Sequence, residues 1–118
     1  MLTYSDLPKS DKRIIQELLN LGAQRMYRKG LKKAESIVEK WKKSIADEKS
    51  DEKFYSNLCK TIVNHDKSIS RTFDGLSGSR FVITVAGLFV DNIIKEDDLK
   101  GLTPDTYEFM LQYKHTME

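Results

Sequence analysis

The segment SRFVITVAGLFVDNIIK, residues 79–95, decides the fold class of this chain. Its β-branched run at residues 82–85 suits a strand by composition. The polar positions, however, recur at intervals of four, three, four and four, at Arg80, Thr84, Gly87, Asp91 and Lys95. Such spacing puts them on one narrow stripe of a helix, whereas a strand alternates polar and apolar residues. The segment is therefore predicted to be a central, mostly buried helix over about 79–95.

Upstream, residues 10–46 carry two apolar stripes with helical spacing. The first contains Ile15, Leu18, Leu19, Gly22 and Met26, and the second Tyr27, Leu31, Ala34, Ile37, Val38, Trp41 and Ile45. On one continuous helix these stripes would point to nearly opposite faces. Gly30 lies between them and suits the left-handed conformation that ends a helix. The pattern favours a hairpin of helices 10–29 and 31–46, with one long helix buried on both sides as the alternative.

In the same region, Leu21 and Gly22, followed by a turn and then Ala34, resemble one unit of the tetratricopeptide family. That resemblance implies two antiparallel helices joined by a turn. Trp41 departs from the family pattern, which has a small residue there, and a single unit cannot bury its own apolar face. The resemblance supports a helical hairpin and implies nothing about function.

Capping residues, proline and glycine mark the other helix boundaries. These signals are, in chain order, Ser10, Ser50 after the charged connector 46–53, Gly101, and Thr103 followed by Pro104. They predict helices that begin near the serines, a short helical turn that ends at the glycine, and a last helix through about residue 116. The helix after Ser50 is expected to end near residue 72. The chain is thus predicted to be all-α, a compact bundle of four or five helices in one domain, residues 1–118.

The composition is that of a soluble globular protein, because 39% of the residues are hydrophobic and 32% are charged. The net charge of +2 is too small to imply a partner. Cys59 is the single cysteine, so no intramolecular disulfide forms, and its apolar neighbours predict a buried, reduced thiol. No secretory signal is visible, and the apolar run at 81–94 is shorter than the roughly 20 residues of a bilayer span. A cytoplasmic location is expected.

The loop DGLSGSR, residues 74–80, is the first candidate site. Ser77 or Ser79 is placed to cap the apolar helix, and Arg80 follows in its first turn. A helix N-terminus with an arginine binds anions. The loop lacks the Lys-Ser/Thr of a nucleotide-binding loop. The structural alternative, which we favour, is a turn in which Asp74 pairs with Arg80.

The segment NHDKSISR, residues 64–71, is the second candidate. Asp66 is predicted to face the core, where a carboxylate needs a partner, and Arg80 is the expected one. That pair is either structural, which we favour, or part of a pocket in which His65 acts as a general base. The full candidate ligand set is His65, Asp66, Arg71, Asp74, Ser77, Ser79 and Arg80.

Basic residues concentrate between residues 25 and 43. Those proposed to contact nucleic acid are Arg25, Lys29, Lys32, Lys40 and Lys43. Such a stripe suits a phosphate backbone, although no aromatic residues are interleaved with it. Solvated lysines on an amphipathic helix are the commoner explanation.

Motifs for catalysis are scarce in this sequence. It has no zinc-binding histidine motif, no paired Cys or His ligand spacing and no nucleophile elbow. We therefore expect no catalytic residues, no metal and no cofactor. The leading hypothesis is a small non-enzymatic helical module that binds another protein or itself as a homo-oligomer. The alternatives are an anion or small-ligand site, including an enzymatic one, around residues 65–80, and nucleic-acid binding through residues 25–43.

Overall fold

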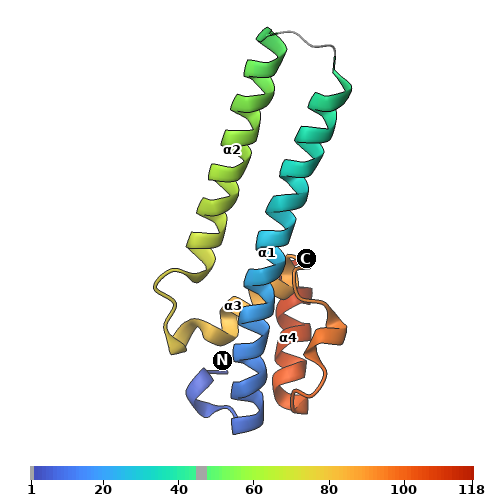
Figure 1. The fold of residues 1–118 in the computed structure, drawn as a ribbon. Coiled ribbons are helices and arrows are strands. Elements are labelled where there is room, and N and C mark those ends of the chain that lie inside the picture. Colours follow the sequence, from blue (N-terminus) through green and yellow to red (C-terminus); the bar gives the residue numbers. More distant parts are fainter. Residues whose placement is uncertain (1, 45–47) are drawn as a thin grey trace. The chain divides into compact units, whose positions relative to one another are not determined.

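The computed structural model describes residues 2–44 and 48–118. Every regular element among them is helical, which confirms the all-α prediction (Figure 1). The α-helices are α1 (Lys9–Lys43), α2 (Glu48–Phe73), α3 (Phe81–Val90) and α4 (Pro104–Met117). Three short 3-10 helices accompany them: η1 (Tyr4–Asp6), η2 (Gly78–Arg80) and η3 (Glu96–Leu99).

The chain divides into two compact units that share α1. The first, called here the packed unit, contains residues 2–25 and 75–118, and therefore the first half of α1 with α3 and α4. The second, called here the hairpin unit, contains residues 26–74, and therefore the second half of α1 with α2.

The packed unit has a continuous apolar core around α3. Leu88 of α3 comes so close to α1 that a Cβ atom on Gly22 would stand 2.6 Å from its Cδ1 atom. The rings of Phe81 and Tyr4 pack in a T-shaped arrangement with centroids 5.0 Å apart. The buried apolar residues of this unit are Leu7, Ile15, Leu18, Leu19, Val82, Val85, Ala86, Leu88, Phe89, Ile94, Leu99 and Met110. Burial on this scale is the main stabilising contribution to such a fold.

The apolar helix α3 is shorter than the predicted span of 79–95. It ends at Val90 because Asn92 takes a left-handed conformation, with φ of 62°. The amides of Asn92 and Ile93 then donate to the carbonyls of Phe89 and Leu88, which closes the helix end as a Schellman motif does. Ile94 lies beyond the helix and is still buried. An apolar, mostly buried helix is thus confirmed, with narrower bounds.

The predicted break at Gly30 is wrong, because α1 runs without interruption through both apolar stripes. Each half of α1 packs within its own unit, so a change of apolar face between the halves needs no turn. A glycine inside a helix costs only about 1 kcal/mol relative to alanine, which tertiary packing easily outweighs. The tetratricopeptide-like turn falls inside the same helix and is absent. Ile45 and residues 46–47 of the predicted connector lie outside the described residues.

Several predicted caps differ from the structure in detail. Ser10 and Ser50 lie inside α1 and α2, which begin one and two residues earlier, at Lys9 and Glu48. The side chain of Ser77 makes no capping hydrogen bond at η2. The C-terminal signals are correct: Gly101 has a left-handed φ of 94° after η3, and Pro104 is the first residue of α4.

The hairpin unit consists of two antiparallel helices, residues 26–43 of α1 and α2 (Figure 1). Near one end, the ring of His65 packs on Gly30, and its Nε2 atom donates to the carbonyl of Met26 at 2.5 Å. Near the other end, Trp41 Nε1 donates to Asp51 Oδ1 at 2.8 Å. These two contacts fix the register of α2 along α1.

Candidate functional site

The predicted ligand set is divided between the two units. His65, Asp66, Arg71 and Asp74 belong to the hairpin unit, and Ser77, Ser79 and Arg80 belong to the packed unit. Asp66 is exposed, so the prediction that it faces the core is wrong, and Arg80 is exposed as well. Asp66 lies at the edge of the apolar stripe of α2, and with only two helices in its unit that edge stays in solvent.

The remaining members of the set have ordinary surroundings. His65 is half-buried and occupied by its hydrogen bond to Met26. The hydroxyls of Ser77 and Ser79 are 2.9 Å apart, and both serines are exposed. Arg71 and Asp74 are exposed. An anion or small-ligand site built from these residues stays a prediction.

Arg25, one of the predicted nucleic-acid contacts, is engaged inside the packed unit. Its guanidinium donates two hydrogen bonds to Asp98, at 2.5 and 3.1 Å, and one to the carbonyl of Ile93 at 2.9 Å. The hydrogen bond to Asp98 raises the pKa of Arg25, and the same bond holds the pKa of Asp98 below its usual value. The other four predicted contacts, Lys29, Lys32, Lys40 and Lys43, are exposed on α1, and nucleic-acid binding by them stays a prediction.

A buried carboxylate that sequence reasoning missed joins the two ends of the packed unit. Asp11 is fully buried, accepts hydrogen bonds from the amide and hydroxyl of Thr103, and accepts a third from the hydroxyl of Thr106. Burial raises the pKa of Asp11, but these hydrogen bonds outweigh it and hold the pKa below its usual value. Asp11 thus anchors the first turn of α4 through Thr103 and Thr106, and Thr103 itself makes no capping hydrogen bond with its side chain. Its role is structural.

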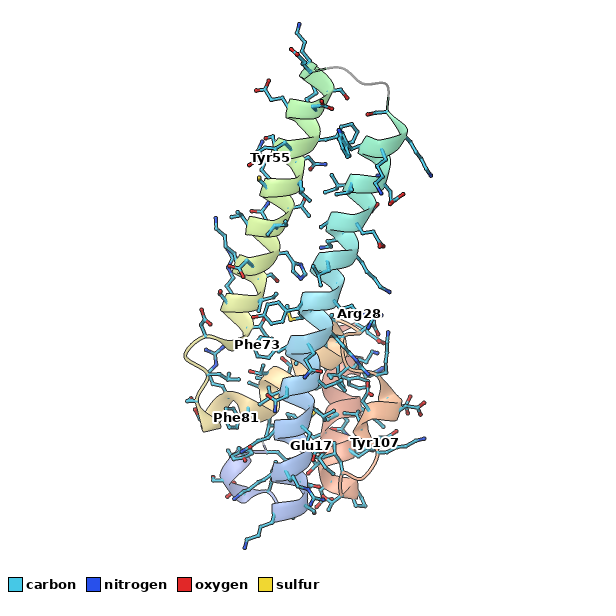
Figure 2. All side chains as sticks on the ribbon, in the orientation of Figure 1. Glu17, Arg28, Tyr55, Phe73, Phe81 and Tyr107 are labelled. Carbon is cyan, nitrogen blue, oxygen red and sulfur yellow. The ribbon has the colours of Figure 1, made fainter. Side chains whose placement is uncertain are left out.

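The hairpin unit carries an unusual number of exposed apolar side chains. Among the described residues, the large hydrophobic side chains that are exposed are Tyr27, Leu31, Trp41, Tyr55, Ile62, Val63 and Met117, of which only Met117 lies outside this unit. Leu31 and Tyr55 are 71% and 72% exposed, and Ile62 is 50% exposed. Figure 2 labels Tyr55 on α2. Cys59 is also exposed, so the prediction of a buried thiol is wrong, for the same reason as for Asp66.

Most of these side chains lie on one face of the hairpin. On each helix they recur at alternating intervals of three and four residues, which keeps them on one side. We call this surface the open face: Tyr27, Leu31, Ala34, Val38 and Trp41 of α1, with Tyr55, Leu58 and Ile62 of α2. All eight residues line one of two shallow grooves between the helices, of about 500 and 230 Å³.

The larger groove lies near the Trp41–Asp51 hydrogen bond. Its apolar lining consists of Ile37, Val38, Trp41, Phe54, Tyr55 and Leu58. Asp51 and Glu52 also line it. Gly30, His65 and Asp66 are among the residues that line the smaller groove. Each groove thus has a mostly apolar lining that includes one or two carboxylates of α2.

Groups of three or more His, Cys, Asp or Glu able to hold a metal ion do not occur among the described residues. Within the same residues, no single helix is long and apolar enough to cross a membrane, and one bent pair of helices meets that requirement by length and composition only. Comparison with protein families, curated proteins and solved structures finds no match to this chain.

Proposed function

We propose that this chain is a small, non-enzymatic helical protein whose function is to bind another polypeptide through the open face of its hairpin unit. The observation that carries the proposal is the exposure of large apolar side chains along one side of the hairpin. Monomeric soluble proteins rarely expose contiguous apolar surface of this kind, and where they do it generally marks a site of interaction.

The residue types on the open face also favour a polypeptide as the ligand. Trp41, Tyr55 and Tyr27 give large, rigid contact areas with a polar tip, the residue types that dominate the energetics of protein interfaces. The grooves follow two antiparallel helices, and a groove between helices is a surface on which an amphipathic helix can dock. Their lining combines many apolar side chains with a few carboxylates, as interfaces combine an apolar centre with polar residues.

A photo-crosslinking experiment tests the proposal. Tyr55 is replaced by a photoreactive phenylalanine analogue in the full chain, which is irradiated in the cells that produce it. We expect a polypeptide adduct of defined mass, identifiable by mass spectrometry. Adding Leu31→Glu and Ile62→Glu should abolish the adduct, because each places a charge in the apolar centre of the face.

The matched control is Ser36→Glu with Ser56→Glu, which adds the same charge at exposed positions that line neither groove. The control should keep the adduct, and both double variants should keep the helical circular-dichroism signal. An adduct that survives Leu31→Glu and Ile62→Glu, or no adduct at all, would contradict a role of the open face in binding.

A further inference from the structure

We propose that the polypeptide bound to the open face is a second copy of this chain, so that two hairpin units form a four-helix bundle. In this dimer α1 of one copy lies beside α2 of the other, and the two-fold axis runs parallel to the helices. The inference rests on the proposed function, because it names the partner of the same surface. It is carried by the pattern of charges along the two edges of the open face.

The first step is the register within one hairpin. Gly30 contacts His65, and Trp41 bonds to Asp51. Because the helices are antiparallel, each step forward along α1 corresponds to one step back along α2. Arg28 therefore stands within about one helical turn of the level of Asp66, and Lys42 within about one turn of the level of Glu52.

The second step is the charge at the edges. On α1, residues seven apart border the open face beside Tyr27, Ala34 and Trp41: they are Arg28, Glu35 and Lys42. On α2 the matching residues, also seven apart, are Glu52, Cys59 and Asp66. All six are exposed, and Figure 2 labels Arg28 on α1. Lys42 also pairs with Glu39 on its own helix, at 3.6 Å, and remains 60% exposed. The outer positions are thus basic on α1 and acidic on α2.

The third step is the choice of symmetry, since a pair of identical faces can associate about a two-fold axis in two ways. With the axis parallel to the helices, α1 meets α2 of the second copy at equal levels. Arg28 then faces Asp66 of the second copy, and Lys42 faces its Glu52. Every outer edge contact joins opposite charges, and each occurs twice.

With the axis perpendicular to the helices, α1 instead meets α1 of the second copy in the opposite direction. Arg28 then faces Lys42, and on the other side Glu52 faces Asp66. Both contacts join like charges, which is unfavourable at an interface. Edge charges of this kind set partner choice and orientation in helical bundles. The charge pattern therefore selects the first arrangement.

Length and composition agree with this partner. The paired part of α1, residues 26–43, spans about five helical turns, or about 27 Å, enough for a bundle of two hairpins. Two such faces would cover the side chains of Leu31, Tyr55 and Ile62, which the hairpin alone leaves in solvent. In such a bundle the exposed apolar side chains of both hairpins would form a shared core.

The test uses the purified full chain and two double variants, with mass measured by light scattering and sedimentation across a wide concentration range. Variant A is Arg28→Glu with Lys42→Glu, which makes both edges acidic. Variant B is Glu52→Lys with Asp66→Lys, which makes both edges basic. The wild-type chain should be a dimer, and each variant alone should dissociate at least about tenfold more readily, which corresponds to about 1.4 kcal/mol.

Mixing A with B should restore the dimer, because both edge contacts again join opposite charges. A misfolded variant would not recover on mixing, so the mixture separates lost pairing from lost folding. A wild-type chain that stays monomeric, a dimer unaffected by the A or B changes, or a mixture that stays monomeric would each overturn the second copy as partner. In those cases crosslinking of the open face to a different protein would still decide the proposed function separately.

Discussion

The packed unit and the hairpin unit are both built from amphipathic helices, yet the apolar side chains are mostly buried in the first and often exposed in the second. In the packed unit Phe89, Leu99 and Met110 are almost completely inaccessible to solvent. In the hairpin unit Leu31, Tyr55 and Ile62 are half or more exposed. Two helices cover only one side of each other, whereas α3 is enclosed by further elements. The comparison teaches that stability comes mainly from the packed unit, and that the hairpin unit has apolar surface available for binding.

Charge separates the two units as well. Residues 26–74 contain twelve Lys and Arg against eight Asp and Glu, a net charge of +4. The remaining residues contain eight against ten, a net charge of −2. The small net charge of the whole chain therefore conceals a basic hairpin. Within the hairpin, the excess positive charge lies on α1, between residues 26 and 43.

The largest effect is expected from truncating the core of the packed unit. Phe89→Ala should lower the free energy of unfolding by about 3–5 kcal/mol, because it removes a buried ring and leaves a cavity. Leu31→Ala, on the open face, should change the stability of the dilute, monomeric chain by no more than about 0.5 kcal/mol. Urea denaturation measures both. Equal losses would mean that the open face is buried in the monomer and that the contrast between the units is false.

The next effect concerns the buried carboxylate of the packed unit. Asp11→Ala should cost about 2–4 kcal/mol, because three hydrogen bonds to a charged group disappear and the Thr103 amide loses its acceptor. Asp97→Ala is the control, since the ion pair of the Asp97 carboxylate with Lys100 is exposed. The control should change the unfolding free energy by less than about 0.5 kcal/mol. If both substitutions lowered the unfolding free energy by a similar amount, the buried hydrogen bonds of Asp11 would not stabilise the packed unit as proposed.

Acid should destabilise the packed unit through the same groups. The pKa values of Asp11 and Asp98 are lower in the folded chain than in the unfolded one, where Asp titrates near about 3.9. Their contribution is therefore present above that pH and lost as the pH falls through the folded values. Urea unfolding at pH values from neutral to acidic measures this slope. Asp11→Asn should reduce the dependence of the unfolding free energy on pH. An unchanged dependence would mean that Asp11 does not contribute to the acid sensitivity.

Two arginines three residues apart on α1 give a matched comparison across the boundary of the units. Arg25→Ala should cost about 1–2 kcal/mol, because Asp98 and the Ile93 carbonyl lose a bidentate, charged donor. Arg25→Lys should restore little of the lost stability, since an ammonium group cannot reproduce the two parallel hydrogen bonds of the guanidinium to Asp98. Arg28→Ala should stay within about 0.5 kcal/mol in the dilute chain. Thermal or urea unfolding measures these stability changes. Equal losses for Arg25→Ala and Arg28→Ala would contradict the assignment of the two arginines to different units.

The sequence predicted the local features of the fold and missed those that depend on distant parts of the chain. Helical spacing correctly predicted an apolar helix, although its predicted span of 79–95 is longer than α3, and the Thr103–Pro104 signal correctly predicted the start of α4. Both features are decided by neighbouring residues. A break at Gly30 was preferred to a continuous α1, which was only the alternative, because the glycine signal is local, whereas the packing that overrides it is not. The Asp11–Thr103 contact joins residues 92 positions apart, and no spacing rule reveals it.

The surface proposed for binding was hidden in the sequence for a related reason. Tyr27, Leu31, Tyr55 and Ile62 were correctly placed on apolar stripes of helices. Whether a stripe is buried, however, depends on how many helices pack against it, and the stripe itself has the same pattern in both cases. The exposure of Asp66 and Cys59 follows from the same missing information.

The smallest expected effect comes from the two glycines that lie inside helices of different units, Gly87 in α3 and Gly30 in α1. A Cβ atom on Gly87 meets no atom within 4 Å, so Gly87→Ala should stabilise the chain by about 0.5–1 kcal/mol through helix propensity alone. On Gly30 the same atom would stand 2.5 Å from Cδ2 of His65. Gly30→Ala should therefore move that ring and break its bond to Met26, which offsets the gain and leaves a change near zero. In a His65→Ala background the obstacle is absent, and Gly30→Ala should stabilise by the same amount as Gly87→Ala. Thermal unfolding of the four hairpin variants gives this coupling directly. Equal effects of Gly30→Ala in both backgrounds would show that His65 does not pack on Gly30. The helix register used to build the dimer would then rest on the Trp41–Asp51 hydrogen bond alone.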